Sequence, residues 1–300
     1  MTPDWRARAA AIIPGGTSTG SKRPDAMFGS TVEGPTHIVS AQGCRISTAD
    51  GDSLIDLTAA LGAVSIGYAD PAVTEAVCRA VCRGPVAALP YTDEVTLAER
   101  LCELVPSAEQ VRFLKTGAEA CAAAVRIARA HTGRDLVLGS GYFGWLDWWT
   151  PAAGVPAGAH ADYRHLPFND RGRWHAELHA AGDRLAAVVV EPLVEVIADV
   201  EWLRELRAHC DQVGAVLIFD EVKTGFRLHR GGAQALLGVT PDLTTLGKAI
   251  ANGFPLAAVV GNSRVMSAVH RTWISSTLAT ELTALAAAHA VLDLLRRRPT

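Results

Sequence analysis

Lysine is scarce in this sequence. Its 300 residues include 28 basic side chains, of which 24 are arginines and only four are lysines. The hydrophobic content of 49% and the charged content of 20% are otherwise ordinary for a globular protein. A chemistry that depends on a lysine amine therefore has four candidates: Lys22, Lys115, Lys223 and Lys248.

Long apolar runs and a strong net charge are also missing. The apolar runs at 185–190 and 215–219 have the length of strands, and none approaches a membrane span. The short apolar stretch near the start ends at Pro14 and is too short for a signal peptide. The net charge of −3 gives no electrostatic reason to bind nucleic acid or an anionic membrane.

The six cysteines show no disulfide or metal-binding pattern. Only Cys78 and Cys82 are close in sequence, and one pair of ligands without a second pair is a poor signal for a metal site. We therefore expect no metal. Reduced cysteines that serve as packing residues also predict a cytoplasmic location.

The chain divides into two parts by pattern. Residues 1–30 predict an irregular arm and residues 35–57 a hairpin with its turn at Asp50-Gly51, so we expect an N-terminal segment over 1–60. From residue 61 to 300 we expect one large domain in which strands alternate with helices. The predicted strands are 111–114, 135–138, 185–190, 215–219, 243–246 and 256–260, and the predicted helices are 71–83, 93–104, 119–131, 202–211, 263–269 and 279–297.

This alternation predicts an α/β fold with a mainly parallel sheet between helices. Such sheets bind ligands at the carboxyl ends of their strands. Lys115, Asp220 and Lys248 each follow a predicted strand closely, so the reactive groups gather where this architecture places a site.

Lys248 and Asp220 together predict a pyridoxal phosphate (PLP) site. A buried amine forms a Schiff base with the cofactor aldehyde, and a carboxylate at the end of an apolar strand keeps the ring nitrogen protonated. Lys223 is the alternative amine, and a surface position is the plainer interpretation of either lysine. For Asp220 the alternatives are a helix cap or a metal ligand, although the nearby His209 and His229 lack the spacing of metal ligands.

The string Thr116-Gly117-Ala118 runs from a predicted strand into an alanine-rich helix. A helix N-terminus exposes unpaired amide groups, so this string predicts a phosphate cradle beside Lys115. The plainer interpretation makes Thr116 a simple helix cap.

Residues 139–144 match the dinucleotide fingerprint GxGxxG, but the bulky residues after them and Pro151 do not open a helix, so we exclude a nicotinamide or flavin site. Tyr142 and Trp145 in and after this string predict an aromatic face for a flat ring, with an ordinary aromatic surface loop as the alternative.

Taken together, these strings resemble the class III aminotransferases, fold-type I PLP enzymes that include the glutamate-1-semialdehyde 2,1-aminomutases. The resemblance runs from 13–16 to 275–277. Its most specific stretches are 219–227, 246–249 and 127–134. It implies a fold-type I sheet of seven-stranded type with an N-terminal arm, together with a small C-terminal domain that this sequence lacks.

The resemblance also implies a role for each matching residue. Lys248 matches the Schiff-base lysine and Asp220 the partner of the ring nitrogen, while Tyr142 and Val222 match the two sides of the ring. Thr277 matches a threonine that reaches the phosphate in the partner subunit, which implies a homodimer with shared active sites. The remaining expected positions are Thr116, Gly117, Ala118 and Glu191 at the cofactor, and Thr19, Lys22 and Trp145 at the substrate.

Three residues depart from the family pattern. Ala118 stands where a threonine is usual and removes one hydrogen bond to the phosphate, a loss worth roughly 1.5–3 kcal/mol unless Thr116 compensates. Phe143 replaces a polar residue beside the ring. Lys22 stands where the aminomutase has an arginine and cannot make its flat bidentate contact with a carboxylate.

The expected function is an aminotransferase that moves an amino group between an amine donor and a small carbonyl compound, either sugar-like or a semialdehyde. An aminomutase, in which the amine returns to the same molecule, is the second hypothesis. A truncated, non-catalytic PLP-binding remnant is the third.

Overall fold

The computed structural model describes residues 4–29 and 34–297. The chain forms two compact units, residues 1–71 and 72–300. We expected the first segment to end at residue 60; paired backbone hydrogen bonds between Gly43 and Tyr68 hold the residues up to 71 with the first unit. The assignment of PLP binding to the second part stays a prediction.

The first unit carries a small antiparallel sheet in the order β1-β2-β3. The predicted turn is present, because the Gly51 amide donates to the Thr48 carbonyl and Gly51 adopts a φ of +98° that favours glycine. The elements of this unit are α1 (Trp5–Ile12), α2 (Pro24–Phe28), β1 (Ile38–Gln42), β2 (Arg45–Thr48), β3 (Ser53–Ile55), α3 (Ala59–Gly62), and the 3₁₀ turns Pro14–Gly16 and Gly20–Lys22.

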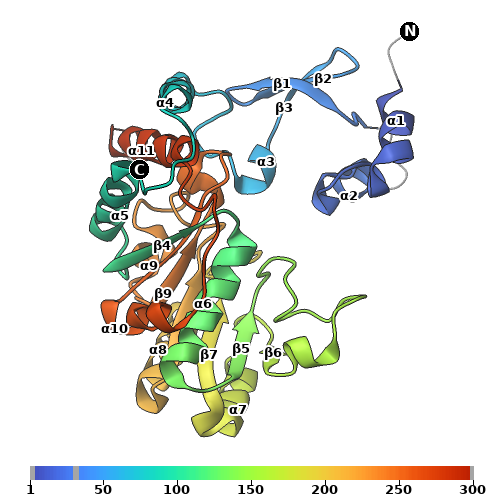
Figure 1. Ribbon diagram of the computed structural model, residues 1–300. Helices are drawn as coiled ribbons and strands as arrows, with labels where there is room; N and C mark the ends of the chain where they lie inside the picture. The colour runs from blue at the N-terminus through green and yellow to red at the C-terminus, as the bar shows by residue number, and fades with distance from the viewer. Residues whose placement is uncertain (1–3, 30–33, 298–300) are drawn as a thin grey trace. The chain divides into compact units, whose positions relative to one another are not determined.

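The second unit is built on a seven-stranded sheet in the order β4-β10-β9-β8-β7-β5-β6 (Figure 1). Strand β10 is antiparallel to both of its neighbours, and the other six strands run in one direction. The strands are β4 (Gln110–Leu114), β5 (Leu136–Ser140), β6 (Tyr163–His165), β7 (Leu185–Val190), β8 (Val216–Asp220), β9 (Leu243–Leu246) and β10 (Ala257–Gly261). The predicted mainly parallel sheet is confirmed.

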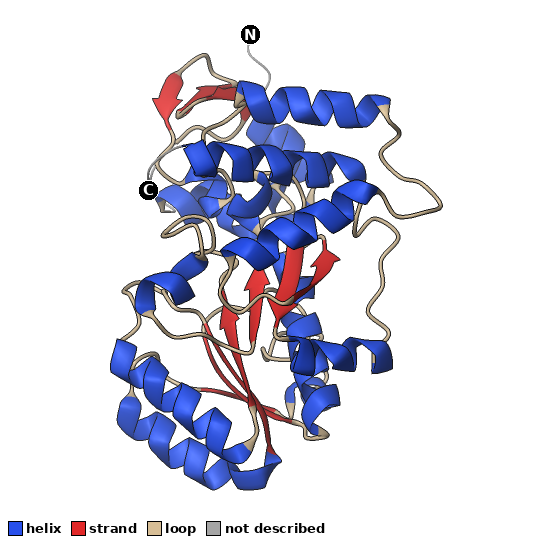
Figure 2. Ribbon diagram, turned by 90° about the vertical axis from the view of Figure 1, so that its left-hand side faces the viewer, coloured by secondary structure: helices blue, strands red, loops and turns tan. Residues whose placement is uncertain are grey.

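Helices cover both faces of this sheet (Figure 2). Along β8, Ile218 packs in the cluster that contains α6 residues such as Ile127, whereas Leu217 packs with Trp202 of α8. Every residue of β7 and β8 is therefore buried, as expected for central strands of a parallel sheet. The helices are α4 (Pro71–Cys82), α5 (Thr92–Leu104), α6 (Gly117–Thr132), α7 (Arg171–Ala181), α8 (Val200–Val213), α9 (Gly232–Leu237), α10 (Ser263–Met266) and α11 (Leu282–Arg297).

Some elements differ from the sequence prediction. Strand β6 was missed because it has only three residues at the sheet edge and pairs only with β5. Helix α7 was missed because its sequence carries little apolar periodicity. Of the six cysteines, Cys44, Cys78 and Cys82 are exposed rather than packed, while all six are unpaired.

None of the helices described in the structure has both the length and the apolar character needed to cross a membrane.

Candidate active site

The predicted residues come together where the parallel strands have their carboxyl ends. We call this row of strand ends the carboxyl edge of the sheet. Lys115 follows β4, Tyr142 follows β5, Glu191 follows β7, and Asp220 ends β8. Lys248 opens a 3₁₀ turn, Lys248–Ala251, two residues after β9. The order of strands, rather than their spacing in sequence, makes these groups neighbours.

Asp220 is 3% exposed, and each oxygen of its carboxylate accepts at least one hydrogen bond inside the protein. Its Oδ1 accepts from the Val222 amide at 3.0 Å and from the Thr245 hydroxyl at 2.9 Å, and its Oδ2 accepts from the Cys121 thiol at 3.3 Å. Burial raises the pKa of Asp220 from 3.8 to about 6, and the charge of Glu191 adds to this rise. A cation placed beside Asp220 would relieve the cost of burying it.

Lys248 supplies an amine at the same edge. Among the described residues, its Nζ makes no hydrogen bond or ion pair. Burial lowers the pKa of Lys248, and so does the positive charge of Lys223, whereas Asp220 and Glu191 oppose the shift. A lysine with a lowered pKa keeps more of its amine in the neutral, nucleophilic form.

Lys223, the alternative amine, is already paired. Its Nζ lies 2.9 Å from Glu191 Oε1 in an ion pair whose carboxylate side chain is 6% exposed. The other oxygen, Glu191 Oε2, accepts from the Tyr142 amide at 2.9 Å. Glu191 therefore connects the loops after β5 and β8, and its pairing with Lys223 leaves Lys248 as the unpaired amine of the two.

The predicted phosphate cradle is the first turn of α6. Thr116 forms a capping box: its hydroxyl accepts from the Glu119 amide at 3.2 Å, and Glu119 Oε2 accepts from the Thr116 amide at 2.9 Å. The plainer interpretation of Thr116 is thus correct as local structure. The Gly117 and Ala118 amides keep their hydrogens free of any partner among the described residues, and the Thr116 hydroxyl still has its own hydrogen to donate.

The cradle is narrow because Val222 packs against it. A Cβ added at Gly117 would lie 2.8 Å from Val222 Cγ1, so a larger residue there would displace the valine. A Cβ added at Gly144 would clash with Cβ and Cα of Ala118, so the close approach of these two residues requires a glycine at position 144. Two open amides, a slot lined by valine and a buried carboxylate form a donor and acceptor set that fits PLP.

Lys115 lies beside the predicted phosphate cradle in the sequence, and the structure pairs its charge with a carboxylate of the chain. Its Nζ lies 2.9 Å from Glu281 Oε1, with both side chains nearly buried at 13% and 12% exposure. Glu281 also accepts from the Thr283 and Ala284 amides at 2.8 and 3.0 Å and so caps α11. The Lys115 charge is therefore committed to fixing α11 on the end of β4.

We expect Glu281→Gln to lower the free energy of unfolding by about 1–3 kcal/mol, because it leaves the nearly buried Lys115 ammonium without a counter-charge. Chemical denaturation measures the loss. The matched control is Glu205→Gln, which breaks a pair with Arg171 that is half exposed on both sides. That control should leave the stability nearly unchanged, because solvent screens an exposed pair. Equal losses in the two variants would contradict the role given to Lys115.

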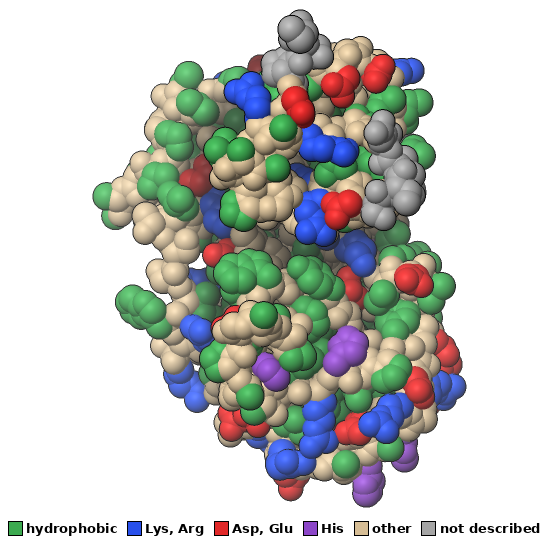
Figure 3. Space-filling view, turned by 90° about the vertical axis from the view of Figure 1, so that its right-hand side faces the viewer, with side chains coloured by type: hydrophobic (Ala, Val, Ile, Leu, Met, Phe, Trp, Pro, Cys, Tyr) green, Lys and Arg blue, Asp and Glu red, His purple; other side chains and the backbone are tan. Residues whose placement is uncertain are grey.

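The loop after β5 contains no α-helix over residues 141–156, in agreement with the rejection of the dinucleotide fingerprint. Tyr142 is 65% exposed, and its ring lies edge-on to Trp149 at 5.7 Å between centroids. Trp145 is 75% exposed. Figure 3 faces the side of this unit where the loop lies and shows hydrophobic side chains gathered there. The two rings are available to a ligand, and among the residues that the structure describes none holds them in a stacked position.

Three further expected residues belong to other segments of the sequence. Thr277 is exposed in the segment before α11. Thr19 and Lys22 belong to the first unit, where the Lys22 amide donates to the Thr19 carbonyl in a 3₁₀ turn. Their roles at the phosphate and the substrate stay predictions.

Sequence reasoning missed the residues that form hydrogen bonds with Asp220 and with the adjacent Glu221. Cys121 and Thr245 contact the Asp220 carboxylate, and the fully buried Glu221 accepts from the Gln234 amide at 3.0 Å and from the Ala233 amide at the start of α9. Burial raises the pKa of Glu221. One signal was available: Cys121 follows Gly117 by one helical turn, which places both on the same face of α6.

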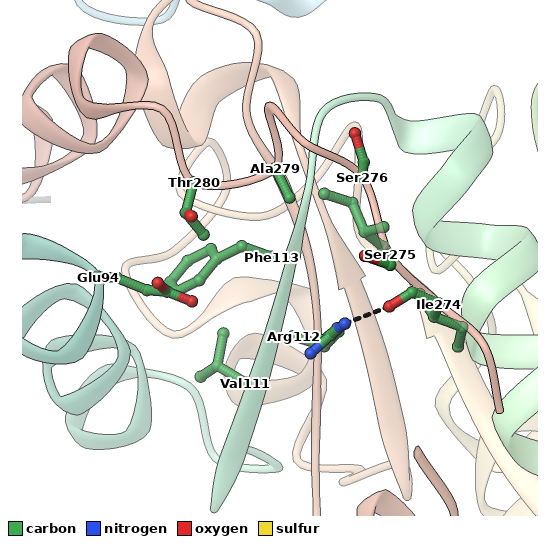
Figure 4. A pocket seen from close by; sticks show the side chains of 10 residues that line it. Glu94, Val111, Arg112, Phe113, Ile274, Ser275, Ser276, Ala279 and Thr280 are labelled. Carbon is green, nitrogen blue, oxygen red and sulfur yellow. Dashed lines mark hydrogen bonds between the residues drawn. The ribbon is translucent and has the colours of Figure 1, made fainter. Parts of the chain in front are cut away.

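A separate cavity of about 180 Å³ lies along edge strand β4 (Figure 4). The Arg112 guanidinium points across it and donates to the Ile274 carbonyl, and Glu94 and Thr280 line its other side. None of the site residues predicted from the sequence lines this cavity, so it is distinct from the cluster at the carboxyl edge.

Comparison with known proteins identifies the class. The family model described as aminotransferase class-III matches residues 29–139 and 151–299. The chain belongs to the class III aminotransferase family. This family depends on PLP, and the residues at the carboxyl edge fit that cofactor.

Particular relatives are similar over most of the chain. A glutamate-1-semialdehyde 2,1-aminomutase of Pyrobaculum calidifontis is 40% identical, over 87% of this chain and 62% of the relative. An omega-transaminase structure from Sphaerobacter thermophilus matches with a TM-score of 0.90 and 33% identity, over 98% of this chain and 72% of that one. A PLP form of the FumI protein of Sphingopyxis matches with a TM-score of 0.92 and 30% identity, over 99% and 73%. The chain thus spans less than two thirds of the length of the aminomutase.

Proposed function

We propose that this protein transfers an amino group between an amine donor and a small carbonyl compound with PLP as cofactor. The observation that carries the proposal is the pairing of two groups at one sheet edge: the Asp220 carboxylate, buried at the end of β8, and the Lys248 amine, unpaired and with a lowered pKa, after β9. Family membership supports the reaction type.

The cofactor, when bound, supplies an electron sink that stabilises negative charge at the carbon next to the amine. Lys248 would hold the cofactor covalently, and its Nζ would serve as the general base and acid that takes a proton from that carbon and returns one. Asp220 holds the ring nitrogen in its protonated form through the charge on its carboxylate. The lowered pKa of Lys248 suits its role as general base, because a base must be unprotonated at the working pH.

The other residues bind and orient the cofactor. Thr116, Gly117 and Ala118 would donate to the phosphate, Val222 would contact one side of the ring and Tyr142 would cover the other. Glu191 holds the Tyr142 backbone through its hydrogen bond and so orients the aromatic loop. Thr277 reaches the phosphate bound in a second copy of the chain, so the working form is a homodimer. Thr19, Lys22 and Trp145 contact the substrate.

A second candidate function is that of an aminomutase, which returns the amine to another carbon of the same molecule. It is favoured by the names of the relatives, of which two are 40% and 38% identical and are glutamate-1-semialdehyde 2,1-aminomutases. Against it, Lys22 replaces the arginine that the aminomutase pattern places at the substrate carboxylate. The two functions differ in whether a separate carbonyl acceptor is needed.

The test is a screen of amine donors against the PLP-loaded protein. At least one donor class should change the visible absorbance of the bound cofactor and leave a keto or aldehyde product, and a carbonyl acceptor should restore the starting spectrum. Turnover of a single amino-aldehyde with no acceptor identifies a mutase. Binding of PLP with no spectral change on any donor contradicts both functions and favours a non-catalytic protein.

A further inference from the structure

The two oxygens of the Asp220 carboxylate are held by unequal donors. Oδ1 accepts two strong hydrogen bonds, from the Val222 amide at 3.0 Å and the Thr245 hydroxyl at 2.9 Å. Oδ2 accepts only from the Cys121 thiol at 3.3 Å. A thiol is a weak donor, so Oδ2 keeps more of its negative charge and more of its capacity to take a proton than Oδ1.

Cys121 is placed for this contact by α6. It lies one helical turn after Gly117, so the face of α6 that carries the open amides also presents the thiol to Asp220. The Cys121 Sγ lies 3.7 Å from the Thr245 hydroxyl as well, and the side chain is 1% exposed. Burial raises the pKa of the Cys121 thiol, and the charge of Asp220 raises it further, so the sulfur keeps the hydrogen that it donates.

The charged groups that act on Asp220 come from several elements. Glu191 after β7 raises the pKa of Asp220, after the larger effect of burial. Lys248 interacts electrostatically with Asp220 from the turn after β9, and Lys223 forms an ion pair with Glu191. Thr245 of β9 and Cys121 of α6 are the uncharged groups in contact with the carboxylate.

We propose that Cys121 and Thr245 are positioning residues that turn Asp220 so that Oδ2 is the oxygen which holds the proton shared with the ring nitrogen of PLP. The inference rests on the proposed function for the identity of that ring, and on the hydrogen bonds alone for the choice of oxygen. Thr245 fixes the carboxylate by occupying Oδ1. Cys121 donates one weak hydrogen bond to Oδ2, and the strength of this bond sets how tightly Asp220 binds a proton.

Substitutions at position 121 should move the proton affinity of Asp220 in opposite directions. Cys121→Ser provides a stronger donor to the charged form and should lower the pKa of Asp220, whereas Cys121→Ala removes the donor and should raise it, each by roughly one unit or less. A role in packing alone predicts no such opposition, since both variants are small and uncharged.

Infrared spectroscopy of the cofactor-free protein measures this. The protonated Asp220 carboxyl band, assigned by its loss in Asp220→Asn, is followed against pH in wild type and in both Cys121 variants. In wild type, the S–H stretching band of Cys121 should shift with the same midpoint, a measurement that requires no variant at position 121 to fold. Cys210→Ser and Cys210→Ala are the matched controls, because Cys210 is equally buried but lies on α8 and contacts neither Asp220 oxygen.

Opposite shifts in the two Cys121 variants and none in the Cys210 variants support the inference. An unchanged midpoint in both Cys121 variants, or a wild-type S–H band that does not respond as Asp220 titrates, overturns it. These results are obtained without PLP, so they are separate from the donor screen. An inactive protein with the expected infrared shifts rejects the function and keeps the positioning role. An active protein without these shifts keeps the function and rejects the positioning role.

Discussion

Replacing Lys248 by alanine is expected to reduce the rate of amine transfer by about 10²–10⁴-fold, the contribution typical of a positioned general acid and base. Lys248 is the unpaired amine at the carboxyl edge, and no other lysine of the second unit is free to replace it. Lys223 is paired with Glu191 and Lys115 with Glu281. Single-turnover spectra of the PLP-loaded protein with an accepted donor measure the loss.

Lys223→Ala is the matched control for that experiment. It removes the other lysine of the same edge and frees Glu191, so it should disturb the Tyr142 loop and weaken cofactor binding without abolishing the reaction. If Lys248→Ala kept a borohydride-reducible link to PLP while Lys223→Ala lost it, the reactive amine would be Lys223 and our assignment would be wrong.

Replacing Asp220 by asparagine is expected to lower the rate constant by about 10²–10³-fold, the loss found when one preorganised electrostatic group is removed from an active site. Asparagine keeps the shape of the side chain and an acceptor for the Thr245 hydroxyl, so the cofactor should still bind. What is lost is the charge that keeps the ring nitrogen protonated. Cofactor affinity and the rate of the donor half-reaction, measured on the same preparation, separate the two effects.

The same substitution should stabilise the cofactor-free protein above neutral pH. The pKa of Asp220 is raised from 3.8 to about 6, so the folded state binds this proton more tightly than the unfolded chain does. The resulting stabilisation is complete below about pH 4 and is lost as the pH rises through about 6. From the size of the shift, the stability of the wild type should fall relative to Asp220→Asn by about 2 kcal/mol between pH 4 and pH 7.

Asp242→Asn is the control for both measurements. Asp242 is also buried, but it pairs with Arg207 at 2.8 Å and accepts from Asn262. It directly precedes β9 and so lies at the amino ends of the strands, opposite to the carboxyl edge. Its replacement should destabilise the protein and leave the rate per folded molecule unchanged. A loss of rate in Asp242→Asn equal to that in Asp220→Asn would show that both act through general unfolding.

Much of the fold followed from local patterns. Uninterrupted apolar runs such as 185–190 can be buried on two sides only in the middle of a covered sheet, and the structure places that run at β7. Elements with weak patterns were missed: β6 is short and peripheral, and α7 has hardly any apolar stripe. The segment after Gly247 is a 3₁₀ turn in which Lys248 adopts a φ of +46°, and none of the predicted elements covers it.

The sequence by itself determined the chemical inventory of this protein: an amine, a carboxylate at a strand end and a helix start with open amides, in an order that resembles one enzyme family. These features are local, because each depends on residues adjacent in the chain. Only the tertiary structure decided which lysine is unpaired, that Lys115 serves α11, and that Cys121 and Thr245 hold Asp220. Such pairings join residues 25 to 166 positions apart, and the order of the strands, which no local pattern encodes, brings them together.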